Sequence, residues 1–189
     1  MGKFELYKEK AMKGLADAKE KKLVDEDAMP FVDEINEKKD YFTSSSCYGR
    51  IYLIDLPSRK KNESLFIEKH HRKVTFKEMK KGLEEHDGKI WFRQEAFILH
   101  VSCRDVESAR KALEAKTRAG IKRGGIFNIK EGRVQIEIEG TQKIDCPIKD
   151  GDKILVSDEY LKHLIKIANE KIENNQKDWE RLRAEFGKI

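Results

Sequence analysis

Apolar and polar residues alternate along residues 133–139, where the apolar positions are Val134, Ile136 and Ile138. Successive side chains of a strand point to opposite faces of a sheet, so this segment predicts a strand with one buried face and one wet face. Residues 96–103 repeat the pattern, with Leu99 and Val101 on one face and His100 on the other. Half-exposed strands are typical of antiparallel sheets, whereas parallel strands read as continuous apolar runs.

Helical and strand patterns succeed one another along the rest of the chain. Capping residues, apolar periodicity and turn residues predict helices and strands at the following positions. The helices are expected at 3–22, 30–38, 75–86, 105–119 and 158–186, and the strands at 50–56, 65–67, 90–93, 96–103, 125–130, 133–139 and 142–146. Strands grouped as hairpins with helices between them predict an α+β fold. We expect a single domain over 1–189, with a mixed, largely antiparallel sheet, flanking helices, an N-terminal helix within 1–24 and a long C-terminal helix at 158–186.

The charge balance permits a polyanionic partner without requiring one. The 189 residues include 40 basic and 35 acidic side chains, interspersed, for a net charge of +5. No apolar run approaches the roughly 20 residues that span a bilayer, so we expect no membrane association. The three cysteines are widely spaced and form no Cys-x-x-Cys pair, which predicts no metal site and a reducing, cytoplasmic location.

A run of hydroxyl side chains, Thr43–Ser46, is followed by Cys47, Gly49 and Arg50. Ser and Thr compete with backbone hydrogen bonds and favour turns, and Gly permits backbone angles that other residues avoid. The Arg50 guanidinium suits a carboxylate or a phosphate. We therefore expect a polar loop at the start of a strand that cradles a polar, partly anionic ligand; the alternative is a plain solvated turn.

Histidines and Cys47 offer further chemistry. His100 lies mid-strand among apolar neighbours, so it is either a core residue with satisfied hydrogen bonds or a base at the cradle. His70 and His71 are adjacent in a predicted strand and point to opposite faces, which disfavours joint chelation of a metal. Cys47 is either a nucleophile activated by Arg50 and loop amides or simply a small polar side chain.

Two nucleotide-binding motifs are absent from the sequence. There is no Gly-x-Gly-x-x-Gly after a predicted strand and no Walker loop. The glycines of residues 120–125 follow a helix and lead into a strand, which is the reverse of a dinucleotide fingerprint. This segment is either a helix stop with a hairpin entry or a basic turn that contacts a ligand through its backbone. The fold is therefore not expected to be a Rossmann fold.

Several segments in a fixed order resemble the wybutosine-synthesizing protein 3 family. The string Ser-Ser-Cys-x-Gly-Arg at 45–50 and the string Leu-His-Val at 99–101 are the most specific. The matching segments cover most of the chain and lie at 33–36, 41–51, 69–72, 97–104, 119–126, 158–161 and 168–171. The chain departs from the family where Ser44 replaces a usual Thr, His70 a usual Trp, and Gly124 a frequent Ser.

The resemblance implies a methyltransferase that uses S-adenosylmethionine. Its substrate would be ring nitrogen N4 of the tricyclic wyosine precursor, 3′ of the anticodon in phenylalanine tRNA, and the enzyme would bind the anticodon stem-loop, with a monomer favoured. The cofactor-binding residues implied are Thr43, Ser45, Ser46, Cys47, Gly49 and Arg50. The catalytic candidates are His100 and His71, as proton acceptor or base-orienting group, with Ser46. The candidate contacts to the RNA backbone are Lys69, Arg72, Lys122 and Arg123.

Two rival functions remain open on the sequence. A non-catalytic tRNA-binding module would grip phosphate with the Ser-rich segment and would bind in a strongly salt-dependent way, without S-adenosylmethionine. A hydrolase or acyl-transfer enzyme would use Cys47 with a histidine, and it would lose activity on alkylation of the thiol. The second rival ranks last because the sequence offers no clear oxyanion motif.

Overall fold

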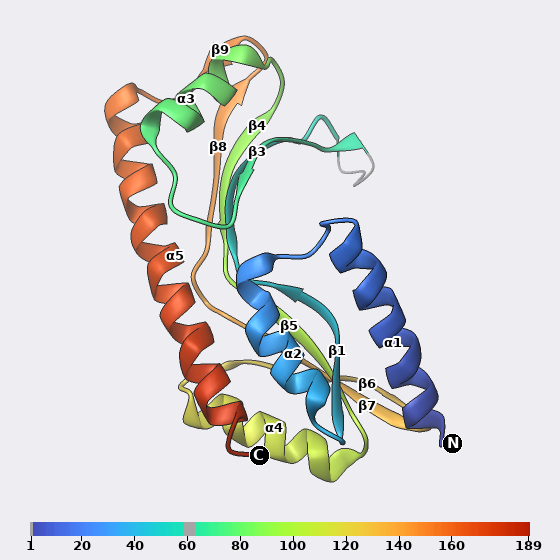
Figure 1. Ribbon diagram of the computed structural model, residues 1–189. Coiled ribbons are helices and arrows are strands. Elements are labelled where there is room, and N and C mark those ends of the chain that lie inside the picture. The colour runs from blue at the N-terminus through green and yellow to red at the C-terminus, as the bar shows by residue number, and fades with distance from the viewer. Residues whose placement is uncertain (1, 59–62) are drawn as a thin grey trace. The chain divides into compact units, whose positions relative to one another are not determined.

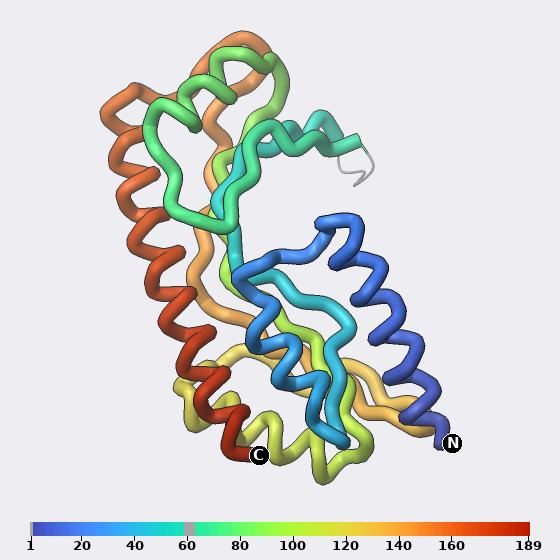
Figure 2. Tube along the Cα trace, in the orientation of Figure 1, coloured from blue at the N-terminus to red at the C-terminus, as the bar shows by residue number. Residues whose placement is uncertain are grey.

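The computed structural model describes residues 2–58 and 63–189. Its contacts divide the chain into two compact units, each built from segments that are not adjacent in sequence. The first unit comprises residues 1–48, 97–141 and 177–189, and the second comprises 49–96 and 142–176. Figure 2 follows the chain through these segments by colour. The expectation of a single domain over 1–189 stays a prediction.

The first unit holds a four-stranded antiparallel sheet (Figure 1). The strand order is β1 (Tyr41–Cys47), β5 (Ile98–Cys103), β7 (Arg133–Glu139) and β6 (Arg123–Lys130). The apolar face packs against α2 (Met29–Glu37), α4 (Val106–Arg118) and the last turns of α5 (Asp158–Phe186). On the other face, Phe4 of α1 (Lys3–Glu20) packs on Phe42 with ring centroids 5.3 Å apart. The short helix η1 (Glu26–Ala28) leads into α2.

The expected alternation is confirmed in β7. Val134, Ile136 and Ile138 are buried on the apolar face. Glu137 and Glu139 point the other way and are partly exposed. Burial of the apolar row removes its surface from water, and this stabilises the sheet against the helices. The polar face remains available for ligands.

The second unit holds a five-stranded antiparallel sheet. Its strand order is β3 (Leu65–His70), β2 (Arg50–Asp55), β4 (Ile90–Glu95), β8 (Ile144–Asp150) and β9 (Lys153–Ile154). The amphipathic helix α3 (Phe76–Glu85) contributes Met79 and Leu83 to the core, which also contains Leu53 and Phe92. Leu161 and other residues from the first turns of α5 complete this core.

The structure confirms an α+β fold with antiparallel pairing and a long C-terminal helix, and it is not a Rossmann fold. It differs from the expected single sheet, because the described strands lie in two sheets. Only residues 96–97 separate β4 from β5, yet β4 pairs with β2 and β8, whereas β5 pairs with β1 and β7. The expected hairpin between them does not form, because the chain passes from one sheet to the other at this point.

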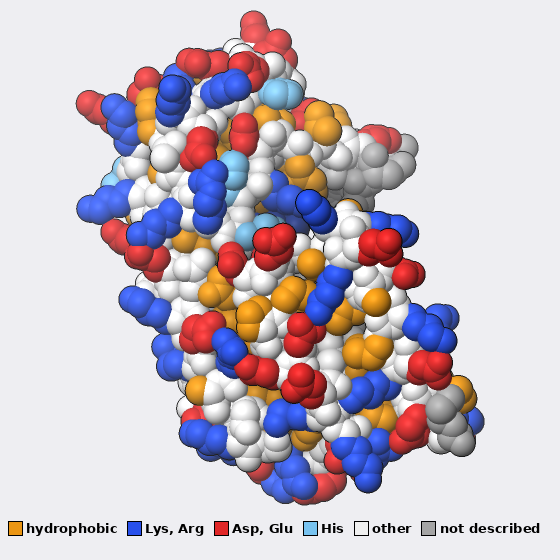
Figure 3. Space-filling model, in the orientation of Figure 1, with side chains coloured by type: hydrophobic (Ala, Val, Ile, Leu, Met, Phe, Trp, Pro, Cys, Tyr) orange, Lys and Arg blue, Asp and Glu red, His pale blue; other side chains and the backbone are white. Residues whose placement is uncertain are grey.

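Charges of both signs are interspersed over the face seen in Figure 3. This matches the nearly equal numbers of basic and acidic residues, 40 and 35. Across the described residues, every helix is too short or too polar to cross a membrane. A surface that binds a polyanion on such a protein must therefore be a region where basic side chains locally outnumber acidic ones.

The first turn of α3 allows a direct test of local stability. Thr75 Oγ1 accepts from the Glu78 amide at 3.3 Å, and the Glu78 carboxylate accepts from the Thr75 amide at 2.7 Å. Capping residues contribute about 1 kcal/mol, so Thr75→Ala is expected to lower the free energy of unfolding by about that amount. The measurement is urea unfolding followed by circular dichroism; an unchanged midpoint would contradict the capping role.

Glu78 also predicts a pH dependence. Hydrogen bonds from Arg72 and Thr75 lower the pKa of Glu78 from its ordinary 4.5 to about 2. A lowered carboxyl pKa stabilises the fold above pH 4.5, and this contribution is lost as the pH falls toward 2. The stability difference between the wild type and Glu78→Gln should therefore shrink over that range. The exposed Glu85→Gln variant serves as the control and should show a smaller change.

Candidate functional site

The hydroxyl run forms a strand, which corrects the loop expected from its sequence. Residues 41–47 are β1, at the edge of the first unit's sheet, with an irregular register between Thr43 and Ser45. Asn36 holds the start of the run: its side chain accepts from the Thr43 amide at 2.8 Å and donates to Thr43 Oγ1 at 3.1 Å. Strand pairing with β5 satisfies the backbone, so Ser44 and Ser45 keep exposed side chains.

A cavity of about 650 Å³ lies beside this strand, between α1, the segment before α2, and β1. The whole hydroxyl run lines it, together with Asp25 and Arg133. Apolar side chains form much of the remaining wall, among them Leu15, Leu23, Val24, Met29, Val32 and Phe42. A hollow of this size with a few polar groups on an apolar wall is typical of small-molecule sites.

Two cationic side chains that the sequence did not single out, Lys10 and Arg133, line this cavity. The guanidinium carbon of Arg133 lies 4.3 Å from the ring centroid of Tyr7, and the buried Nε of Arg133 has no hydrogen-bond partner among the described residues. Buried donors are normally satisfied in folded proteins. Because Arg133 lines the cavity, its guanidinium gives the wall a positive charge that suits an anionic ligand. The alternation that places Glu137 on the polar face places Arg133 there too, and this signal could have found it.

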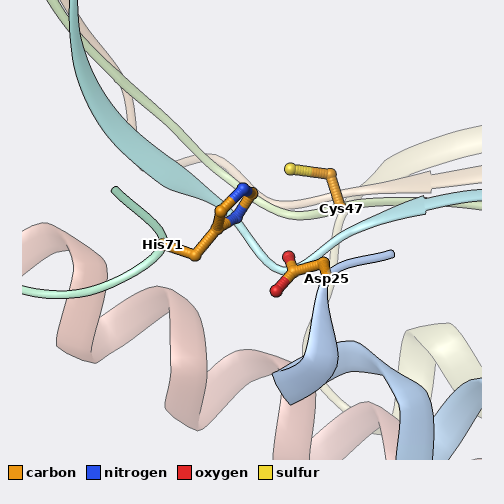
Figure 4. A group of neighbouring side chains, drawn as sticks. All are labelled: Asp25, Cys47 and His71. Atoms are coloured by element: carbon orange, nitrogen blue, oxygen red, sulfur yellow. The ribbon is translucent and has the colours of Figure 1, made fainter. Parts of the chain in front are cut away.

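The other end of the hydroxyl run is held by Asp25. Asp25 stands just before η1, and one of its carboxylate oxygens accepts from the Tyr48 amide at 2.6 Å. Asp25 lies near Cys47, which ends β1, and both are labelled in Figure 4. A carboxylate oxygen of Asp25 and the thiol sulfur of Cys47 lie within 4.8 Å of each other. Burial raises the pKa of Cys103 to about 12, so this thiol stays protonated and is not a nucleophile.

His100 lies on the polar face of the sheet, partly exposed. It sits opposite Ser45 on β1 and Glu137 on β7. Its Nε2 is 2.8 Å from Glu137 Oε2, and its ring lies 5.1 Å from that of Phe127. A carboxylate on one ring nitrogen fixes the orientation of a histidine. The polar face thus brings His100 next to the strand that lines the cavity.

The remaining cradle residues belong to the second unit. Gly49 has φ +96°, a left-handed conformation that requires glycine, and its carbonyl oxygen lies 2.9 Å from His71 Nδ1. His71 follows β3 and is also labelled in Figure 4. Arg50 binds Glu95 through its Nε at 2.9 Å, and its guanidinium lies 5.0 Å from the Tyr52 ring centroid. Its carboxylate partner in this structure is therefore a protein side chain.

The expected RNA contacts fall in both units. In the second unit, Lys69 lies 5.6 Å from the Phe66 ring centroid, and Arg72 pairs with Glu78 at 2.8 Å. In the first unit, Lys122 and Arg123 stand at the entry to β6 and are exposed.

Lys116 holds the turn from α4 into the sheet at residues 122–124, where β6 begins. Burial lowers the pKa of Lys116, and its Nζ lies 3.2, 3.5 and 3.1 Å from the carbonyl oxygens of Lys122, Arg123 and Gly124. Gly124 has φ +105°, and a Cβ there would collide with the backbone of β7. These contacts hold the backbone of the segment, and its two cations, Lys122 and Arg123, are exposed.

A family model, described as Methyltransferase TYW3, matches residues 6–188 of the chain. A curated relative from Thermococcus sibiricus is 33% identical over 188 residues, covering 98% of this chain and 95% of the relative. It is named a tRNA(Phe) 7-((3-amino-3-carboxypropyl)-4-demethylwyosine(37)-N(4))-methyltransferase. The tRNA wybutosine-synthesizing protein 3 homolog of Danio rerio is 33% identical over 170 residues, covering 88% of this chain and 68% of the relative.

Solved structures agree with these sequence matches. The chain is similar to the PH1069 protein of Pyrococcus horikoshii, with a TM-score of 0.91 and 32% identity, over 96% of this chain and 94% of that one. It is also similar to a hypothetical protein from Aeropyrum pernix, with a TM-score of 0.74 and 26% identity, over 85% of this chain and 96% of that one. The backbone arrangement is thus shared with proteins of related sequence.

Lys116→Met tests how the turn is held. The change leaves three carbonyl oxygens without their donor, so we expect unfolding to cost about 1–3 kcal/mol less. Backbone amides of residues 122–124 should also exchange with deuterium faster than in the wild type. Lys111→Met, at an exposed position of the same helix, is the matched control. Unchanged exchange at the turn in Lys116→Met would contradict the role given to this side chain.

Proposed function

Because the chain belongs to the TYW3 methyltransferase family, we propose that it methylates ring nitrogen N4 of the tricyclic wyosine precursor in phenylalanine tRNA. The proposal includes S-adenosylmethionine as the methyl donor, action on the anticodon stem-loop as a monomer, and a cytoplasmic location. It is supported by the names of relatives that match nearly the whole chain. The residues around the cavity in the first unit provide independent support.

The unsatisfied Arg133 in the cavity is the observation that carries the cofactor proposal. S-adenosylmethionine has a carboxylate, an ammonium group, ribose hydroxyls and an apolar-faced adenine. Arg133 offers a buried donor for the carboxylate, and Asp25 lies on the same wall as a negative charge. Ser45 and Ser46 offer hydroxyls for further hydrogen bonds. The residues present therefore fit this cofactor in size, charge and hydrogen bonding.

Arg50 takes a different role in this proposal from the one that the family resemblance implied. Its guanidinium is engaged by Glu95 and packs over Tyr52 and Phe66, all within the second unit. We propose that Arg133, and not Arg50, binds the cofactor carboxylate, because the Nε of Arg133 is buried without an acceptor among the described residues. We assign Arg50 to shaping the backbone after Gly49, and Thr43 to anchoring the strand through Asn36.

S-adenosylmethionine, when bound, supplies a methyl group on a sulfonium sulfur: the new nitrogen–carbon bond forms as the carbon–sulfur bond breaks, and the ring nitrogen gives up its proton. The protein needs no nucleophile for this reaction, which disfavours a covalent role for Cys47. His100 is the proposed proton acceptor, since Glu137 orients its ring and it lies next to the strand that lines the cavity. Ser46 would position the cofactor, and His71 is the second candidate for the proton.

Basic residues would hold the RNA by its backbone. Lys122 and Arg123 are exposed at the start of β6, in the sheet that carries His100, and Lys116 holds the backbone there. Lys69 and Arg72 offer further cations at the end of β3 and just after it. Phosphate contacts of this kind position RNA without reading its sequence, and they weaken with salt.

Arg133→Met tests the proposal at the cofactor. A hydrogen bond between charged groups contributes about 1.5–3 kcal/mol, so the Kd for S-adenosylmethionine, measured by calorimetry, should rise roughly 10- to 100-fold. Arg110→Met removes an exposed, ion-paired arginine of α4 and should bind like the wild type. If Arg133→Met bound S-adenosylmethionine as tightly as the wild type does, the proposal that the cofactor binds in this cavity would be wrong.

The reaction itself is tested with tRNA that carries the unmethylated tricyclic base. Labelled S-adenosylmethionine should add one methyl group to that base, as identified by nucleoside mass, and His100→Ala should lower the rate about 100-fold or more. The Ser46→Ala variant should be slower as well. Salt-sensitive RNA binding without any methyl transfer would instead identify a non-catalytic tRNA-binding module.

A further inference from the structure

An aromatic ring is presented to solvent by the edge strand of the first unit's sheet. Phe127 of β6 is 52% exposed. Its neighbours Ile126 and Asn128 pair with Ile136 and Gln135, and the register shifts between them, so Phe127 is the extra residue of a bulge. Bulges re-aim a side chain and are frequent next to functional sites. This local distortion is what turns the Phe127 ring toward His100.

The Phe127 ring lies against a residue of the proposed reaction. Its centroid is 5.1 Å from that of His100, with the ring planes tilted by 43°. His100 is itself fixed by Glu137, so one side of Phe127 has a rigid support. The exposed remainder of the ring belongs to the polar face of the sheet, close to His100. The exposed face of the Phe127 ring can therefore stack on another flat ring that is bound next to His100.

The surrounding segment departs from the charge mixture of the rest of the chain. Residues 116–130 contain five basic residues and no Asp or Glu, whereas the whole chain has 40 basic and 35 acidic residues. Lys122, Arg123 and Lys130 are exposed. Arg123 approaches Glu139 only to 3.7 Å. Cations at both ends of β6 with an aromatic ring between them are complementary to a polyanion that carries flat bases.

We propose that Phe127 stacks on a nucleobase of single-stranded RNA, and that Lys122, Arg123 and Lys130 hold the flanking phosphates. This inference rests on the proposed function for the identity of the RNA, and it adds a stacking residue that lies next to the proposed proton acceptor. Proteins that recognise unpaired RNA bases commonly stack them on exposed aromatic side chains of a sheet. The ring and the cations have separable effects, because stacking is insensitive to salt and phosphate contacts are not.

Binding of a fluorescent, unmodified anticodon stem-loop of phenylalanine tRNA, measured by anisotropy at several salt concentrations, tests the proposal. Phe127→Ala should raise the Kd about tenfold or more at every salt concentration, with an unchanged slope of log Kd against log salt. Phe127→Trp should bind at least as tightly as the wild type. Ile129→Ala is the matched control, since Ile129 is 65% exposed on β6 but lies opposite Val134, on the other face.

Removal of the two cations should give the complementary result. The double variant Lys122→Gln, Arg123→Gln should reduce the salt slope by roughly 1.4, because each phosphate of a single strand that a cation neutralises adds about 0.7 to the slope. Phe127→Ala binding equal to wild type, or an effect of Ile129→Ala as large as that of Phe127→Ala, would overturn the stacking role. So would sedimentation showing that Phe127→Ala dissociates a dimer, because the ring would then contact a second copy of the chain.

The two proposals fail in different ways. If the binding results hold but no methyl group is transferred to modified tRNA, the stacking surface stands and the enzymatic proposal falls. If methyl transfer proceeds at the wild-type rate and affinity in Phe127→Ala, the enzymatic proposal stands and the stacking role falls.

Discussion

The edge-to-face packing around Trp179 is the contact on which the first unit depends. Phe31 of α2, Tyr48 just after β1 and Phe97 just before β5 surround its ring, with centroids 5.2, 5.5 and 5.4 Å away. Edge-to-face pairs add to the stability gained by burial alone, because the positive edge of one ring meets the negative face of another. This cluster fixes one end of both strands. The register of β1 against β5 places Ser45 opposite His100, and the indole of Trp179 packs at the end of that strand pair.

The alternation of side chains along β7 places both the proposed cofactor-binding residue and the residue that orients the proposed proton acceptor on one face of the sheet. The buried row of β7 holds the sheet against its helices, so the opposite row is free to carry polar groups without loss of core. Arg133 faces the cavity on that row, and Glu137 orients His100 further along the same row. Cofactor binding, proton transfer and base stacking are thus proposed for a single sheet face. Regular pleating gives these groups a spacing that a loop would not hold.

Much of the fold was predictable, and the failures have physical causes. The alternation at 133–139 and the Leu99–His100–Val101 pattern indicated the strands and their faces, and Thr75 indicated the start of α3. The hydroxyl run was wrongly expected to be a loop, because local propensity cannot register pairing with a strand that lies far along the chain. The division of the strands into two sheets was not predicted for the same reason, because it too depends on which strands pair over long distances along the chain. The alternation along 133–139 placed Arg133 on the polar face, but only the fold reveals that a cavity lies there and that its Nε is buried without an acceptor among the described residues.

The interleaving of the two units has a consequence for synthesis on the ribosome. Domains usually fold as they emerge, beginning at the N-terminus. Here the core of the first unit needs Trp179, Leu182 and Phe186, which are translated after all four strands of its sheet. The strands of its sheet are complete by residue 139, yet the last turns of α5, which pack on their apolar face, come later in the chain. Until these residues have left the ribosome, only α2 and α4 can cover the apolar face of the nascent sheet, and the core is completed only afterwards.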